Sequence, residues 1–255
     1  NSLLLAALAQ RRAVTADDGY DALMKRLGRF LASQQLPSGA IAAFWDPATG
    51  KPVPDQYGRF ATGEAFWGLA ILNRLFPSEG WGRPALAVAH YLATERVASE
   101  GYAVRLADHW AAYGLAEFDP GDLDGVLVDY ARRLTGYFAL TIRVESQRTG
   151  SGINLLLRGY PGPGAGIGTA GEGLGALLRL ARRDPRLADV QPGLAERIGC
   201  MAGIMAGAQV DAEEASQFPR PGLTRGAWFY RDYTQMDDQQ HVVSALLAAL
   251  AAVSP

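Results

Sequence analysis

The sequence predicts an all-α protein built from helical hairpins, and three patterns indicate this fold class. Apolar residues recur with helical spacing along most of the 255 residues. Strand signals are weak, with short extended pieces expected only at residues 101–104 and 227–230. The connectors are rich in Gly and Pro, and short connectors alternate with long ones. Hairpins with tight turns on one side and long loops on the other build an (α/α) toroid or a solenoid.

The expected helices follow one another along the whole chain. Residues 18–35 carry an apolar stripe at helical spacing that includes Leu23, Leu27 and Phe30. Thr62 is a plausible N-cap for the next helix, and Glu64 lies in its first turn. The expected helices after the first stripe span residues 62–76, 81–97, 108–118, 123–144, 169–183, 194–209 and 237–253. Residues 2–8 are either the first helix of the fold, which we favour, or the tail of an export or anchor segment.

The bulk composition excludes some classes of partner. The formal net charge is −2 and no basic face is interleaved with aromatics, so nucleic acid is not an expected partner. Cys200 is the single cysteine, which excludes an internal disulfide, and its apolar surroundings predict a buried, inert thiol. No stretch reaches the roughly 20 apolar residues of a transmembrane helix.

The domain organisation and location are expected as follows. Residues 1–255 are predicted to form one domain of a longer chain, because the sequence starts at Asn1 and not at Met. An extracytoplasmic or membrane-anchored location is favoured over a cytoplasmic one, with any membrane tether supplied by residues outside this chain.

The first candidate site is a polar cluster at the start of the expected helix 108–118. Asp108 and His109 precede Trp110, and Trp110, Tyr113 and Glu117 share one helix face. Asp108 is either a helix N-cap or a cavity carboxylate. Trp110 and Tyr113 are either core residues or surfaces on which a sugar stacks.

The second candidate site opens the last expected helix with Asp237, Asp238, Gln239, Gln240 and His241. One aspartate is expected to cap the helix, and the other, at i−3 from His241, could orient the imidazole as a general base requires. The two glutamines could hydrogen-bond ligand hydroxyls. A metal site is not expected, because no histidines are paired at i, i+4 and no cysteines cluster.

Aromatic residues precede two of these helices. Trp228, Tyr230 and Arg231 suit stacking on a sugar and recognition of an anionic or hydroxylated ligand, although they could equally anchor a loop. Trp45 and Tyr57 lie in a similar loop before the helix that carries Glu64. Glu64 is either a partner of the helix dipole or a cavity acid, and Glu172 repeats this ambiguity.

The glycine-rich stretch 159–175 superficially fits a dinucleotide fingerprint. That fingerprint requires a preceding buried strand and a βαβ unit; residues 155–158 are a short candidate strand, but no β/α alternation follows. The stretch is therefore expected to be a flexible lid or a turn leading into a helix. Its Gly171-Glu172 pair, followed by an apolar helix, repeats Gly63-Glu64 and indicates an internal repeat.

These motifs resemble the α/α-toroid group, which holds six-hairpin glycosidases, N-acylglucosamine 2-epimerase-like enzymes and terpenoid cyclases. The segment 31–40 resembles a helix-end element repeated in such toroids. Residues 63–65, 108–110 and 238–241 resemble helix starts that face the cavity in the sugar-processing branch. The resemblance implies a toroid or partial toroid, since fewer helices are predicted than a complete toroid has.

The expected function is a carbohydrate-processing enzyme, glycoside hydrolase-like or sugar epimerase-like, that acts by acid–base chemistry without a cofactor. The expected catalytic residues are Asp237, Asp238, His241, Asp108 and Glu64. The expected substrate-binding residues are Trp45, Tyr57, His109, Trp110, Tyr113, Trp228, Tyr230, Arg231, Gln239 and Gln240. The alternative is a non-catalytic domain of a cell-envelope protein that binds a glycan or another partner. A terpenoid cyclase is less favoured, because residues 239–241 are polar.

Overall fold

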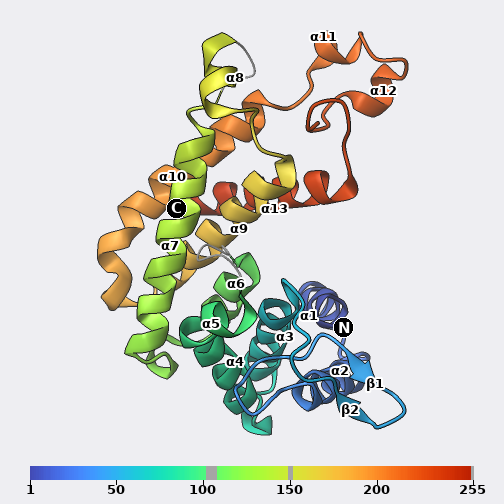
Figure 1. Ribbon diagram of the computed structural model, residues 1–255, viewed down its shortest axis with the longest axis vertical. Coiled ribbons are helices and arrows are strands. Elements are labelled where there is room, and N and C mark those ends of the chain that lie inside the picture. Colours follow the sequence, from blue (N-terminus) through green and yellow to red (C-terminus); the bar gives the residue numbers. More distant parts are fainter. Residues whose placement is uncertain (102–107, 149–151, 254–255) are drawn as a thin grey trace. The chain divides into compact units, whose positions relative to one another are not determined.

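The computed structural model describes residues 1–101, 108–148 and 152–253, and Figure 1 shows their arrangement within each part of the chain. The described residues confirm the all-α prediction, apart from one antiparallel pair of two-residue strands. The chain divides into two compact units, Asn1–Arg132 and Arg133–Pro255. The division falls inside the helix α7 (Gly125–Glu145) and not in a loop.

The first unit is organised around the helix α3, which is buried on nearly all sides. The helices α1, α2, α4 and α6 pack on α3, and Phe66, Leu69 and Leu72 of α3 are fully buried. A helix that is apolar on all faces belongs in a core, which explains its central position. The elements are α1 (Ser2–Thr15), α2 (Asp21–Ser33), β1 (Trp45–Asp46), β2 (Lys51–Pro52), α3 (Ala61–Leu75), η1 (Pro77–Glu79), α4 (Gly82–Thr94), α5 (Arg96–Glu100), α6 (His109–Glu117) and η2 (Pro120–Asp122).

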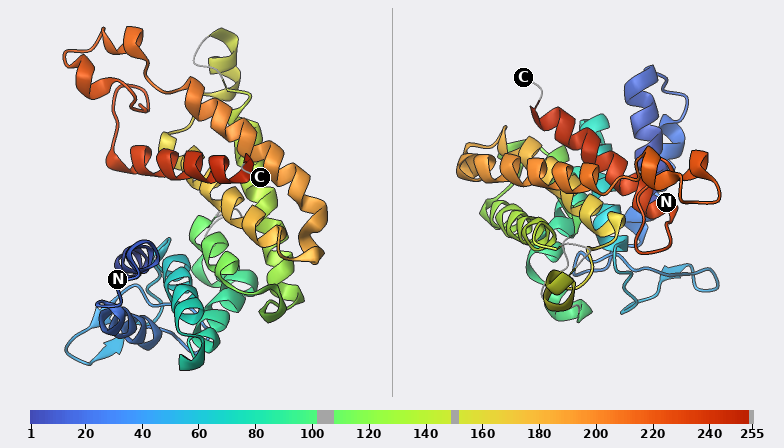
Figure 2. Two further views of the ribbon diagram at one scale, coloured as in Figure 1. Left: turned by 180° about the vertical axis from the view of Figure 1, so that it is seen from behind. Right: turned by 90° about the horizontal axis from the view of Figure 1, so that it is seen from above.

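The second unit is organised in the same way around the helix α9. The helices α10 and α13 pack on α9, and Figures 1 and 2 show α9 and α13 side by side. Its other elements include two short helices, α11 and α12, on the segment between α10 and α13. The elements after α7 are α8 (Gly152–Arg158), α9 (Gly164–Ala181), η3 (Pro185–Val190), α10 (Gln191–Gly207), α11 (Ala212–Ala215), α12 (Pro221–Thr224) and α13 (Met236–Val253).

Glycines allow α9 to approach α13 closely. A Cβ atom added to Gly168 would lie 2.5 Å from the backbone carbonyl carbon of His241, and one added to Gly171 would lie 2.9 Å from Cβ of Ala245. A side chain at either position would therefore force the two helices apart. This contact explains why a glycine-rich segment is helical here: the close packing offsets the poor helix propensity of glycine.

Several sequence expectations are corrected by these elements. Residues 159–163 are non-helical and lead into a helix as expected, but α9 already begins at Gly164, so the prediction of a lid or turn at residues 164–168 is wrong. The candidate strand 155–158 lies in the helix α8, and residues 227–230 form no strand beyond the isolated bridge between Tyr230 and Tyr233. The expected extended piece at residues 101–104 lies outside the described residues except for Gly101. Residues 2–8 are helical and belong to α1.

Candidate functional site

Asp238 joins the beginnings of two helices. Its side chain is 1% exposed, and its Oδ1 accepts a hydrogen bond of 2.9 Å from the backbone N–H of Ala165 in the first turn of α9. Its Oδ2 accepts from the N–H of Gln235, 3.3 Å away, immediately before α13. A carboxylate at two helix N-termini satisfies orphan N–H groups and complements both helix dipoles. Asp238 therefore acts as a structural cap for both helices.

His241 lies in the first turns of α13 between two carboxylates. Its Nδ1 is 2.9 Å from Oε2 of Glu172 on α9, and its Nε2 is 3.3 Å from Oδ1 of Asp237. The Glu172 carboxylate is buried with the imidazole, whereas the Asp237 side chain is 59% exposed. The partners of the imidazole are thus Asp237 at i−4 and Glu172, and not Asp238 at i−3 as the sequence predicted.

The two carboxylates favour the protonated imidazole. Burial by itself would lower the pKa of His241, but the hydrogen bond and charge of Glu172, together with Asp237, outweigh burial and raise the pKa. The contact with Glu172 also orients the ring, with the Nδ1 proton donated to a buried carboxylate and Nε2 on the side of the exposed one. Such an imidazole can take up and release a proton at Nε2.

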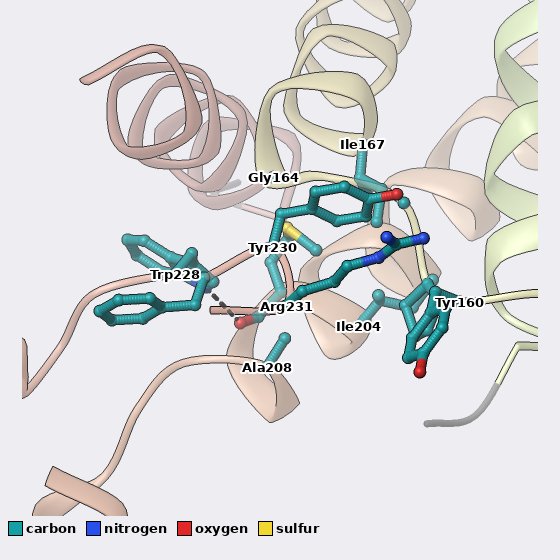
Figure 3. A pocket seen from close by; sticks show the side chains of 12 residues that line it. Tyr160, Gly164, Ile167, Ile204, Ala208, Trp228, Tyr230 and Arg231 are labelled. Carbon is teal, nitrogen blue, oxygen red and sulfur yellow. Dashed lines mark hydrogen bonds between the residues drawn. The ribbon is translucent and has the colours of Figure 1, made fainter. Parts of the chain in front are cut away.

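A small pocket of about 190 Å³ lies at the start of α9 (Figure 3). Its walls come from the segment before α9, from the end of α10 and from the loop before α13. The lining residues are Tyr160, Pro161, Gly162, Gly164, Ile167, Ile204, Met205, Ala208, Trp228, Phe229, Tyr230 and Arg231. The segment that carries Tyr160 is fixed by the N–H of Gly162, which donates to Glu145 of α7 over 2.7 Å.

Trp228 is the fixed wall of this pocket. The side chain is buried, and its indole Nε1 donates to the carbonyl oxygen of Met205 over 2.7 Å. Gln239 bonds both the N–H and the carbonyl oxygen of Trp228, so this glutamine anchors the loop. Gln240 donates to Asp237 over 3.0 Å. Both glutamines thus make hydrogen bonds within the protein.

Arg231 contributes a positive charge to the pocket. Its guanidinium carbon lies 4.7 Å from the ring centroid of Tyr160 and 5.3 Å from that of Tyr230, as Figure 3 shows for the stacked side chains. Both distances fall within the range of a cation–π contact. The pocket and His241 are neighbours along α9: Gly164 and Ile167 line the pocket, and Gly168, one turn beyond Gly164, abuts His241.

The first unit holds a separate buried network around Asp108. Asp108 is fully buried, caps α6 by accepting from the N–H of Ala111, and pairs with Arg96. Arg96 also pairs with Glu100 over 3.1 Å and donates to the carbonyl oxygen of Arg59. Burial raises the pKa of Asp108, and the charge of Arg96 opposes this rise. The residue is thus a structural cap and ion-pair partner.

Three other expected residues of the first unit, His109, Trp110 and Tyr113, lie in an aromatic cluster, and Glu64 is half-buried. Trp67 stacks on Trp110 at 5.2 Å and on Tyr113 at 4.9 Å between ring centroids. His109 is buried, with its ring centroid 4.2 Å from that of Trp110. The half-buried Glu64 has its pKa raised by burial and, to a smaller extent, by the charge of Asp108.

Trp45 and Tyr57 have other neighbours. Trp45 in β1 packs against Phe30 of α2, with 5.8 Å between ring centroids. The Tyr57 hydroxyl donates to Oδ1 of Asp55 over 3.5 Å. Partial burial raises the pKa of Tyr57, and the negative charge of Asp55 raises it further. Glu117, which the sequence placed on one helix face with Trp110 and Tyr113, pairs with Arg74 and accepts from the indole N–H of Trp67.

Two contributors were missed as site residues from the sequence. Glu172 was noted only as an ambiguous acid, although the repeated Gly-Glu pair marked its position. Tyr160 carried no signal, because its neighbours Pro161 and Gly162 indicated only a turn.

Comparisons with protein-family models, curated proteins and solved structures found no match. Among the helices of the described residues, none has both the length and the apolar composition that crossing a membrane requires.

Proposed function

We propose that this protein is a carbohydrate-processing enzyme in which His241 transfers a proton. The observation that carries the proposal is the buried contact of His241 Nδ1 with Glu172, 2.9 Å long, with the exposed Asp237 at Nε2. A buried carboxylate that orients an imidazole while its other nitrogen stays near solvent-exposed groups is suited to general acid–base catalysis.

Of the two expected chemistries, the sugar epimerase-like one has more support than glycoside hydrolysis. Hydrolysis commonly uses two carboxyl groups that flank the scissile bond. Here Glu172 and Asp237 both contact the same imidazole, and Asp238 is occupied by backbone N–H groups. An imidazole that removes a proton from carbon fits the first half of an epimerisation, and delivery of the proton to the opposite face then requires the intermediate to turn over before His241 returns it.

The ligand in this proposal binds at the pocket formed by Tyr160, Trp228, Tyr230 and Arg231. Aromatic rings beside a guanidinium suit a ring that carries polar groups. The resemblance of residues 63–65, 108–110 and 238–241 to helix starts of toroid enzymes supports the same class of substrate, and the toroid arrangement itself is part of this proposal.

The second candidate function is a non-catalytic glycan-binding domain. Two observations favour it: no carboxylate is among the lining residues of the pocket, and Asp108 and Asp238 serve as helix caps. The pocket would then bind a glycan without catalysing a reaction, and the contact between His241 and Glu172 would only hold α13 against α9. Partners other than a glycan, and a membrane tether, stay predictions.

The test follows hydrogen exchange and product formation by NMR in D₂O with a panel of monosaccharides and aminosugars. The wild type should exchange a carbon-bound hydrogen of its substrate, and His241→Gln should lose at least ~100-fold of that rate, the lower range for a general acid–base group. His90→Gln is the matched control, because His90 lies partly exposed on α4, 3.3 Å from the carboxylate of Asp124.

Two results would count against this function. Undiminished turnover in a folded His241→Gln variant would remove His241 from the chemistry. A thermal shift with a sugar but no turnover across the panel would favour the glycan-binding domain.

A further inference from the structure

We infer that the pocket at Arg231 recognises an oxyanion carried on a sugar ring, and therefore selects acidic over neutral sugars. The inference rests on the proposed function in so far as the ligand is a sugar. The oxyanion is either the carboxylate of a uronic acid or the phosphate of a sugar phosphate, because both present oxygens to the guanidinium fork.

The backbone at Arg231 is the first reason. Tyr230 and Tyr233 bond each other through N–H to carbonyl contacts of 2.9 and 3.3 Å, so Arg231 and Asp232 form the tip of a tight turn. Arg231 is the first tip residue and has φ of 60°, a conformation that glycine adopts without strain. An arginine is strained there, because its Cβ atom crowds the backbone. Strain of this kind is common where a side chain is held for a ligand.

The charge of the pocket is the second reason. Arg231 is the only charged residue that lines it, and in the parts of the chain that the structure describes no carboxylate forms an ion pair with this guanidinium. A cation beside apolar and aromatic walls attracts an anion more strongly than a cation in open water does, since the walls lower the local dielectric constant.

The shape of the cation is the third reason. The rings of Tyr160 and Tyr230 lie near the guanidinium (Figure 3), which favours the rotamers that keep its planar fork beside them. The start of α9 is not the group that recognises the anion, because the N–H of Ala165 already donates to Asp238.

The volume of the pocket limits the size of the ligand. At about 190 Å³ it is below the roughly 300 Å³ of the smallest common ligand pockets, which favours a single sugar ring over an oligosaccharide chain.

The experiment measures binding by titration calorimetry with glucuronate, glucose 6-phosphate, glucose and glucosamine. The wild type should bind at least one of the two anions at least tenfold more tightly than glucose, and the more tightly bound anion identifies the source of the oxyanion. Arg231→Gly should lose at least tenfold in anion affinity while its thermal midpoint stays level or rises, since glycine relaxes the turn. Arg231→Lys should retain part of the affinity, because it keeps the charge and loses the fork.

Arg225→Gln is the matched control. It removes one positive charge from the same exposed segment, and Arg225 does not line the pocket. Its anion affinity should equal that of the wild type. Equal binding of glucose and the anions, binding of none of the four probes, or unchanged anion affinity in Arg231→Gly would each overturn the inference.

Turnover measured on the same panel separates this inference from the proposed function. Anion binding that depends on Arg231 without any turnover would uphold the pocket and count against the enzyme. Turnover of a neutral sugar that survives Arg231→Gly and is lost in His241→Gln would uphold the enzyme and overturn the anion site.

Discussion

Asp108 is tolerated in the core because its charge is fully engaged. Arg96 and the N–H of Ala111 contact its two oxygens, and Glu100 holds the other side of the guanidinium. The Tyr91 hydroxyl completes the network by donating to Glu100 over 3.0 Å. Removing one member of such a network leaves an uncompensated buried charge.

Asp108→Asn should therefore lower the free energy of unfolding by about 3–5 kcal/mol, the usual cost of breaking a buried ion pair. Asparagine keeps the capping oxygen, so the loss reports the charge and not the cap. Urea unfolding followed by circular dichroism measures it. Asp18→Asn, at an exposed position, should change stability by less than ~0.5 kcal/mol, and a similar small effect at Asp108 would contradict the network.

His241 gives the protein a stability that depends on pH. Its pKa is raised in the folded state above the ordinary value of 6.5, so the folded state binds the proton more tightly than the unfolded state. The resulting stabilisation is complete below pH 6.5 and is lost as the pH rises through the raised pKa.

The difference in unfolding free energy between the wild type and His241→Gln should thus shrink from pH 5.5 to pH 9. Urea titrations at four pH values measure it, with His90→Gln as the exposed control. A difference that is constant with pH would mean that the two carboxylates do not favour the imidazolium.

The glycines of α9 set the distance between two helices. Gly168→Ala should destabilise the protein by about 1–3 kcal/mol, the usual cost of overpacking, because the new methyl group would meet the backbone at His241. Gly199→Ala, in the middle of α10 with open space around it, should instead stabilise by up to ~1 kcal/mol. Denaturant unfolding measures the change in the free energy of unfolding for both variants. The two changes should have opposite signs, and equal changes would exclude a tight contact between α9 and α13.

The sequence predicted elements well where one apolar stripe dominated. The helices α2 and α6 were expected within a few residues of their bounds, since their stripes and the N-cap Asp108 are local signals. The start of α9 was missed, because glycine propensity argued against a helix and only the partner α13 explains it. The pairing of His241 with Glu172 was missed for the same reason: it joins residues 69 positions apart.

At the scale of the whole molecule, the net charge leads us to expect no binding of nucleic acid. The chain carries 24 Lys and Arg against 26 Asp and Glu, which leaves no excess of positive charge for a phosphate backbone. Fluorescence anisotropy with labelled 20-mer single- and double-stranded DNA at low salt should show no binding at micromolar protein. Binding that weakens steeply with added salt would contradict this expectation.

The close contact of α9 with α13 also constrains how this sequence can diverge over evolutionary time. Any descendant that keeps the two helices at their present separation has to keep a residue without a side chain at positions 168 and 171. We expect the acid at 172 and the imidazole at 241 to change together, since replacing Glu172 alone would remove the buried carboxylate at Nδ1 of His241. A Gly-x₂-Gly-Glu string followed about 70 residues later by Asp-Asp-x-x-His is therefore the pattern that we expect relatives of this chain to share.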